Sequence, residues 1–133
     1  MKENTEKKKM SKETIEQFEK DRYLFVKEFI SPDLAKLMTT YTLHQARHNH
    51  SPEGADGQIP HTHSVHGDHL MESVFEHTWP KMEELTGVEL WPTYTFYRVY
   101  KRGDILKHHT DRPACEISAT ICLGYDYSNL DTF

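Results

Sequence analysis

The residues most able to do chemistry are His109 and Asp111, which lie two positions apart near the C-terminal end of the sequence. In an extended segment the side chains at i and i+2 point to the same face, so this imidazole and this carboxylate can reach one cation. A histidine and a carboxylate are two of the three ligands of the facial triad that holds non-haem Fe(II), whose open positions suit dioxygen chemistry. The spacing alone also allows an alternative, in which the two side chains only hydrogen-bond each other in a turn.

The pair closes a longer motif. The pattern Tyr-x-x-Gly-x-x-(Tyr or Leu)-x-x-His-x-Asp is present as Tyr100, Gly103, Leu106, His109 and Asp111. It resembles the signature of the prolyl-4-hydroxylase-like branch of the 2-oxoglutarate- and Fe(II)-dependent dioxygenases. Residues 115–123 look like the strand that follows this motif in the family, and residues 23–41 and 87–100 look like segments that precede it.

The resemblance implies an activity and its cofactors. Fe(II) on His109 and Asp111 would work with 2-oxoglutarate and O2 to hydroxylate a C–H bond, by analogy in a prolyl or other peptide substrate, with ascorbate as reductant. Tyr100 matches a position at which the family often places a tyrosine facing 2-oxoglutarate. Leu106 stands where an aromatic residue is more usual. The resemblance therefore implies an iron- and 2-oxoglutarate-dependent oxidoreductase.

Further residues are candidates for contact with the co-substrate. The second tyrosine that some relatives place on 2-oxoglutarate is absent near position 123, so we expect Tyr97 or Tyr125 to replace it. Arg98 shares strand parity with Tyr100, and its guanidinium suits a carboxylate of the substrate or co-substrate. An ion pair of Arg98 with an acidic residue at 104 or 116 is an open alternative.

Two features that the family needs are not recognisable in the sequence up to Phe133: a distal histidine as third iron ligand, and a basic residue that pairs with the far carboxylate of 2-oxoglutarate. The sequence is therefore expected to be the N-terminal part of such an enzyme. A different class of function also fits, a metal- or peptide-binding module without catalysis. Unpaired sheet edges in such a piece would favour self-association.

Ten histidines are the anomaly of the composition. Four of them follow the spacing H-x-H-x-x-H-x-x-H, at His61, His63, His66 and His69. Imidazole suits Zn, Ni and Cu, so a second metal site, and with it a His-rich metal-binding protein, is a third hypothesis. A polar loop explains the same pattern, because no cysteine or acid with structural-zinc spacing accompanies it. A narrower hypothesis makes one of the four the third ligand at the His109/Asp111 site.

The N-terminal part of the chain is predicted to be helical. Residues 1–10 are expected to form a charged, disordered lead-in. Residues 11–87 are expected to form a helical support region, in which Ser31 and Pro32 open one helix and Gly87 closes another. Pro80 is expected to end one helical stretch and to open a further turn.

The C-terminal part is predicted to be β structure. Aromatic and β-branched residues mark a strand at 91–101, and further strands are predicted at 105–109 and 115–123. Helices followed by strands indicate a single α+β domain over residues 11–133, with the N-terminal helices packed on an antiparallel sheet. The core strands at 91–125 would be the first part of a double-stranded β-helix, or jelly roll, which is incomplete because that fold needs about eight strands.

Composition argues against several other classes. The 133 residues include 16 Lys+Arg and 21 Asp+Glu, a net charge of −5, without a basic stripe, so a nucleic-acid binder is not expected. No apolar run approaches the roughly 20 residues of a membrane span, and the polar N-terminus does not resemble a secretory signal. Cys115 and Cys122 lie too far apart along one predicted strand to bridge each other. We therefore expect a cytoplasmic protein with free thiols.

Overall fold

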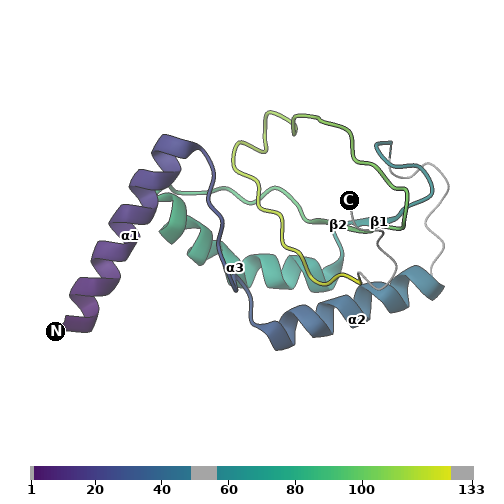
Figure 1. Cartoon of the computed structure of the whole chain (residues 1–133), viewed down its shortest axis with the longest axis horizontal. Helices are drawn as coiled ribbons and strands as arrows, with labels where there is room; N and C mark the ends of the chain where they lie inside the picture. The colour runs from purple at the N-terminus through teal and green to yellow at the C-terminus, as the bar shows by residue number, and fades with distance from the viewer. Residues whose placement is uncertain (1, 49–56, 127–133) are drawn as a thin grey trace.

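The computed structural model describes residues 2–48 and 57–126, with side chains placed from residue 12 onward. Its regular elements are α1 (Lys2–Asp21), α2 (Pro32–His48), β1 (His63–His66), α3 (His69–Thr86) and β2 (Phe96–Val99). The two strands form an antiparallel sheet, which confirms the predicted α+β class. Figure 1 shows α1 at one end of the molecule, with α2 and α3 below the sheet.

Local capping interactions set the helix ends that the sequence predicts. The Ser31 hydroxyl accepts a hydrogen bond from the backbone N–H of Leu34 (3.2 Å), and Pro32 is the first residue of α2. At the end of α3, Gly87 has a φ of 74°, which favours glycine, and its N–H donates to the carbonyl of Glu83 (2.8 Å). Both predicted boundaries are confirmed.

Two helical segments differ from the prediction. Pro80 lies inside α3, which continues to Thr86, because the fixed φ of proline is compatible with a helix and only one intrahelical hydrogen bond is lost. The helix α1 begins at Lys2, so residues 2–10, predicted to be a disordered lead-in, are helical. Lysine and glutamate favour helix, and neither Gly nor Pro interrupts this run.

The sheet is smaller than the sequence predicts. β1 arises in a stretch without a strand signal and pairs with β2, with His63 opposite Val99. β2 covers only part of the predicted strand at 91–101, and the predicted strands at 105–109 and 115–123 are not formed in the described part of the chain. A period-two pattern becomes a strand only where a neighbour supplies the ladder hydrogen bonds, and the described residues offer these two segments none.

The core lies between one face of the sheet and two helices. Tyr97 of β2 packs with Met38 of α2 and with Met71 and Val74 of α3, and all four side chains are buried. Partly buried side chains extend this cluster: Ile30, Leu34, Tyr41, Val65, Leu70, Val99 and Leu123. Full burial of one large apolar side chain contributes roughly 1.5–3 kcal/mol, so this cluster holds the sheet against the helices.

Residues 103–126 form a long loop, called the C-terminal arch below, that runs above the sheet and then turns down toward the helices (Figure 1). The arch returns to α2, where the Thr39 hydroxyl donates to the Leu123 carbonyl (2.7 Å). Most of its residues are exposed and none is in a strand. Side-chain contacts must therefore hold the arch in place.

Two smaller findings bear on the expected class of protein. None of the helices in the described residues has the length and apolarity needed to cross a membrane. Cys115 and Cys122 are both free thiols, as the sequence predicts.

Candidate functional site

The structure brings His109 and Asp111 together on the C-terminal arch. Nε2 of His109 lies 3.7 Å from Oδ1 of Asp111, and the two side chains are 36% and 45% exposed. The predicted strand is absent at this point, yet the i and i+2 side chains still converge. A separation of 3.7 Å exceeds hydrogen-bond length, so the hydrogen bond of the alternative interpretation is not formed.

A second contact orients each member of this pair. Nδ1 of His109 lies 2.9 Å from the carbonyl oxygen of Lys107. A carbonyl can only accept, so Nδ1 carries a proton, and in the neutral form of the ring the lone pair is then on Nε2, the atom nearest Asp111. Oδ2 of Asp111 accepts a hydrogen bond from the Ser118 hydroxyl (2.6 Å). Nε2 and Oδ1 are thereby presented toward each other.

The spacing of these atoms fits two ligands of one divalent cation. Metal–nitrogen and metal–oxygen bonds of about 2.0–2.2 Å place two ligands at right angles about 3.0 Å apart. The observed 3.7 Å between His109 and Asp111 therefore needs a closure of less than 1 Å. Among the residues that the structure describes, no three His, Cys, Asp or Glu side chains gather as a metal-binding group. The described residues thus offer two ligands and not the third.

The four closely spaced histidines are spread over different surroundings. His63 is buried on the helix side of the sheet, with Nε2 3.1 Å from the Tyr97 hydroxyl. The ring of His66 stacks on Tyr94, with centroids 4.5 Å apart and planes 15° apart. His61 and His69 are exposed. Residues three apart in a strand face opposite sides, which separates His63 from His66 and leaves no shared metal site within the described residues.

Tyr97 is placed differently from its predicted role. Its side chain is only 7% exposed and lies in the core with α2 and α3. Burial, followed by the charge of Asp68 and the neighbouring Tyr41, raises the pKa of Tyr97 to about 12. The prediction that Tyr97 contacts the co-substrate is corrected accordingly, because odd positions of β2 face the helices and even positions face the arch.

Arg98 and Tyr100 lie on the arch side of β2, as their shared parity predicts. The guanidinium carbon of Arg98 lies 4.7 Å from the Phe96 ring centroid, and Nη1 donates to the Tyr100 hydroxyl (3.4 Å). Arg98 also donates to the side-chain oxygen of Gln58. Tyr100 is 52% exposed. A carboxylate ligand at this end of β2 would meet a guanidinium and a phenol.

Sequence reasoning missed two contacts of the site. Ser118 bonds Asp111, although the hydroxyl comes seven residues later and no local pattern marks it. Tyr94 is the second: the guanidinium of Arg112 lies 4.5 Å from its ring centroid. The side-chain hydrogen bond to Tyr94 raises the pKa of Arg112 above its ordinary value.

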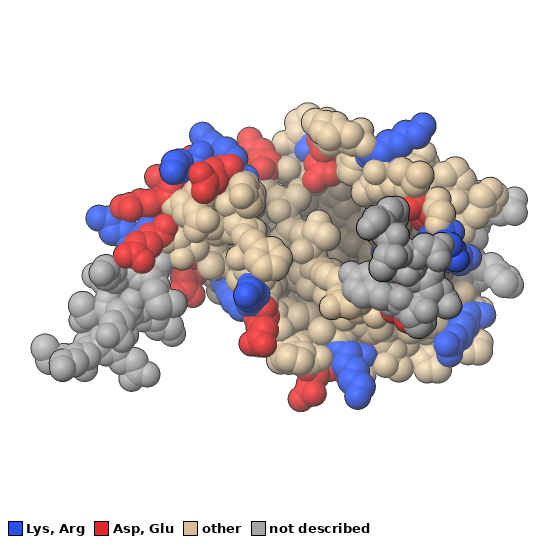
Figure 2. All heavy atoms as spheres, in the orientation of Figure 1, with Lys and Arg blue, Asp and Glu red and all other residues tan. Residues whose placement is uncertain are grey.

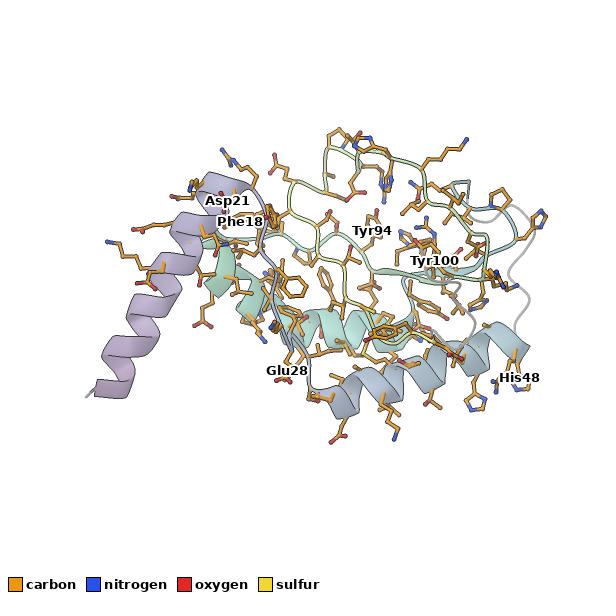
Figure 3. The ribbon with its side chains drawn as sticks, viewed as in Figure 1. Phe18, Asp21, Glu28, His48, Tyr94 and Tyr100 are labelled. Carbon is orange, nitrogen blue, oxygen red and sulfur yellow. The ribbon has the colours of Figure 1, made fainter. Side chains whose placement is uncertain are left out.

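The face shown in Figure 1 can also be viewed with all its atoms. Figure 2 shows a hollow on this face of the molecule, walled mainly by uncharged residues. Figure 3 shows Tyr94 within the arch and Tyr100 near the end of β2. Comparison of the chain with protein-family models, curated proteins and solved structures finds no match.

Proposed function

We propose that this chain carries part of the active site of a 2-oxoglutarate- and Fe(II)-dependent oxygenase of the prolyl-4-hydroxylase-like kind. The observation that carries the proposal is the pair formed by Nε2 of His109 and Oδ1 of Asp111, 3.7 Å apart. Each residue is oriented by a separate hydrogen bond, to Lys107 and to Ser118. The motif from Tyr100 to Asp111 supports the same assignment.

Bound Fe(II), with 2-oxoglutarate and O2, would supply the oxidation of a C–H bond, in a prolyl or other peptide substrate by analogy. The chain's own residues have more limited roles. His109 offers a nitrogen lone pair, Asp111 offers a carboxylate oxygen, and Arg98 with Tyr100 can bind a carboxylate. The proposal requires a third ligand and a basic anchor from outside the described residues, on further strands of a jelly roll.

The proposal also includes association with another chain and a location in a reducing compartment. Several large apolar side chains are exposed, among them Phe25, Trp91 and Ile105. A contiguous patch of such side chains would favour association with another chain, or self-association. Cys115 and Cys122 are free, which fits a reducing compartment such as the cytoplasm.

Metal binding and turnover test the proposal directly. Wild-type chain is titrated with Co(II) as a visible-absorption probe, and is assayed for conversion of 2-oxoglutarate to succinate with Fe(II) and ascorbate. His109→Ala is compared with His108→Ala, a matched control in which the neighbouring exposed histidine is removed. We expect His109→Ala to lose the Co(II) spectrum and His108→Ala to keep it, with unchanged helicity in both. Equal Co(II) affinity in the two variants would reject the assignment.

The same experiment separates the other candidate functions. A metal-binding module without catalysis is favoured by the two-ligand site, and it predicts Co(II) binding without succinate formation. A His-rich metal-binding protein predicts tight Zn or Ni binding that survives the loss of both His109 and Asp111.

A further inference from the structure

Residues from two other segments contact Tyr94; we call Tyr94, His66 and Arg112 the Tyr94 cluster. The ring of His66, at the end of β1, stacks on Tyr94 with centroids 4.5 Å apart. The guanidinium of Arg112, on the C-terminal arch, lies 4.5 Å from the same Tyr94 centroid. Arg112 directly follows Asp111 in the sequence, so this contact ties the metal-ligand pair to the segment just before β2.

The tyrosine at the centre of the cluster has a rigid support. The next residue, Thr95, donates its N–H and its hydroxyl to Oε1 of Glu72 on α3, at 2.9 and 2.7 Å. The Thr95 carbonyl accepts from the N–H of Gly67 (3.0 Å), just after β1. A continuous path of contacts therefore runs from α3 through residues 94 and 95 to Arg112.

Another contact joins the arch to this segment: the Thr93 hydroxyl lies 3.9 Å from Sγ of Cys115. The arch forms no strand in the described residues, and Asp111 and Arg112 are exposed. The N–H of Cys115 donates to the carbonyl of Arg112 (2.8 Å), which closes a turn just after Asp111. That turn shapes the arch locally, whereas the contact of Arg112 with Tyr94 joins the arch to the segment just before β2.

We propose that the Tyr94 cluster positions Asp111 relative to His109, so that Arg112, Tyr94 and His66 set the metal affinity of the pair without touching the metal. The effect on metal affinity rests on the proposed function, whereas the positioning of the arch does not. Residues that orient metal ligands typically change metal affinity by about 10–100-fold when they are removed. Arg112 is thus a positioning residue rather than a ligand.

Variants at Tyr94 separate positioning from a general loss of stability. Tyr94→Phe keeps the ring on which the guanidinium and the imidazole rest and loses only the hydroxyl that hydrogen-bonds Arg112, whereas Tyr94→Leu removes both ring and hydroxyl. We expect Tyr94→Leu and Arg112→Ala to weaken Co(II) binding about tenfold or more, and Tyr94→Phe to restore most of the affinity. Lys81→Ala is the matched control, because it removes a cation 4.7 Å from the ring of Phe29, outside this cluster. Equal affinities in Tyr94→Leu and Tyr94→Phe would overturn the proposal.

A metal-free measurement keeps the inference separate from the proposed function. The exchange rate of the Cys115 amide reports how often its hydrogen bond to the Arg112 carbonyl opens. The amide of Gly87, which is hydrogen-bonded to the Glu83 carbonyl at the end of α3, serves as the reference. We expect Arg112→Ala and Tyr94→Leu to speed exchange at Cys115 relative to Gly87, and Tyr94→Phe to leave the ratio unchanged. If wild type binds no Co(II), the proposed function fails, and this ratio still decides the inference: an unchanged ratio in Arg112→Ala and Tyr94→Leu overturns it.

Discussion

Replacing Tyr97 by phenylalanine tests whether the residue belongs to the core or to the site. The Tyr97 side chain is 7% exposed, and its hydroxyl lies 3.1 Å from Nε2 of His63. Tyr97→Phe keeps the packing of the ring against α2 and α3 and removes only this buried polar contact. We expect a loss of about 1 kcal/mol in the free energy of unfolding at neutral pH.

The same substitution has a predicted pH dependence. The pKa of Tyr97 is raised from 10.0 to about 12, first by burial and then by the charge of Asp68. Between these pH values the Tyr97 phenol has lost its proton in the unfolded chain and keeps it in the folded chain, so the free energy of unfolding falls as the pH rises. Below pH 10 the phenol is protonated in both states, and the stabilisation by Tyr97 is fully present. A shift of this size corresponds to at most about 2.7 kcal/mol, and solvent screening reduces the expected loss to about 1–2 kcal/mol.

Urea unfolding followed by far-UV circular dichroism measures this effect from neutral pH to pH 12. Phenylalanine does not ionise, so the stability advantage of wild type over Tyr97→Phe should shrink, and can reverse, above pH 10. Tyr23→Phe is the control, since Tyr23 is 66% exposed and its loss should change stability by less than about 0.5 kcal/mol at any pH. A constant difference between wild type and Tyr97→Phe over the whole pH range would refute the placement of Tyr97 in the core.

Three further substitutions test the supports of the fold by urea unfolding. Gly87→Ala places a Cβ at a φ of 74° and within 2.9 Å of a side-chain carbon of α1, and should lower the free energy of unfolding by about 1–3 kcal/mol. Gly57→Ala is the control, because a Cβ there has no atom within 4 Å and should leave stability nearly unchanged. Equal losses of stability in the two variants would contradict the contact between Gly87 and α1. Asp68→Ala removes the carboxylate that accepts hydrogen bonds from two backbone N–H groups at the start of α3. It should lower the free energy of unfolding by about 1–2 kcal/mol, and an unchanged urea midpoint would contradict this role of the cap. Thr39→Val removes the 2.7 Å hydrogen bond to the Leu123 carbonyl and should cost about 1 kcal/mol while speeding exchange in the arch; unchanged exchange would show that other contacts hold it.

Helix boundaries were predictable because they depend on neighbouring residues. The cap at Ser31 and the closure at Gly87 each involve partners within four positions along the chain. Pro80 was misjudged because its local tendency to end a helix was opposed by tertiary burial of α3 side chains such as Met71 and Val74.

The candidate site was predictable in part for a related reason. His109 and Asp111 are two positions apart, so their side chains converge even though the expected strand is absent. Ser118 and Tyr94 reach this region from more distant positions, and nothing in the local pattern of the sequence selects them. The pairing of β1 with β2 is likewise long-range, and the spacing of His63 and His66 in the sequence therefore does not show that they lie on opposite faces of the sheet.

The sequence by itself determined the helix caps and the His109/Asp111 pair, because the interactions concerned act within a few residues of backbone. It also set the alternation of Tyr97 and Arg98 along β2, since neighbouring side chains in a strand face opposite sides. Only the tertiary structure decided which of these two faces is buried. A strand has no inner face of its own, and the packing of α2 and α3 made Tyr97 a core residue and left Arg98 on the side of the arch.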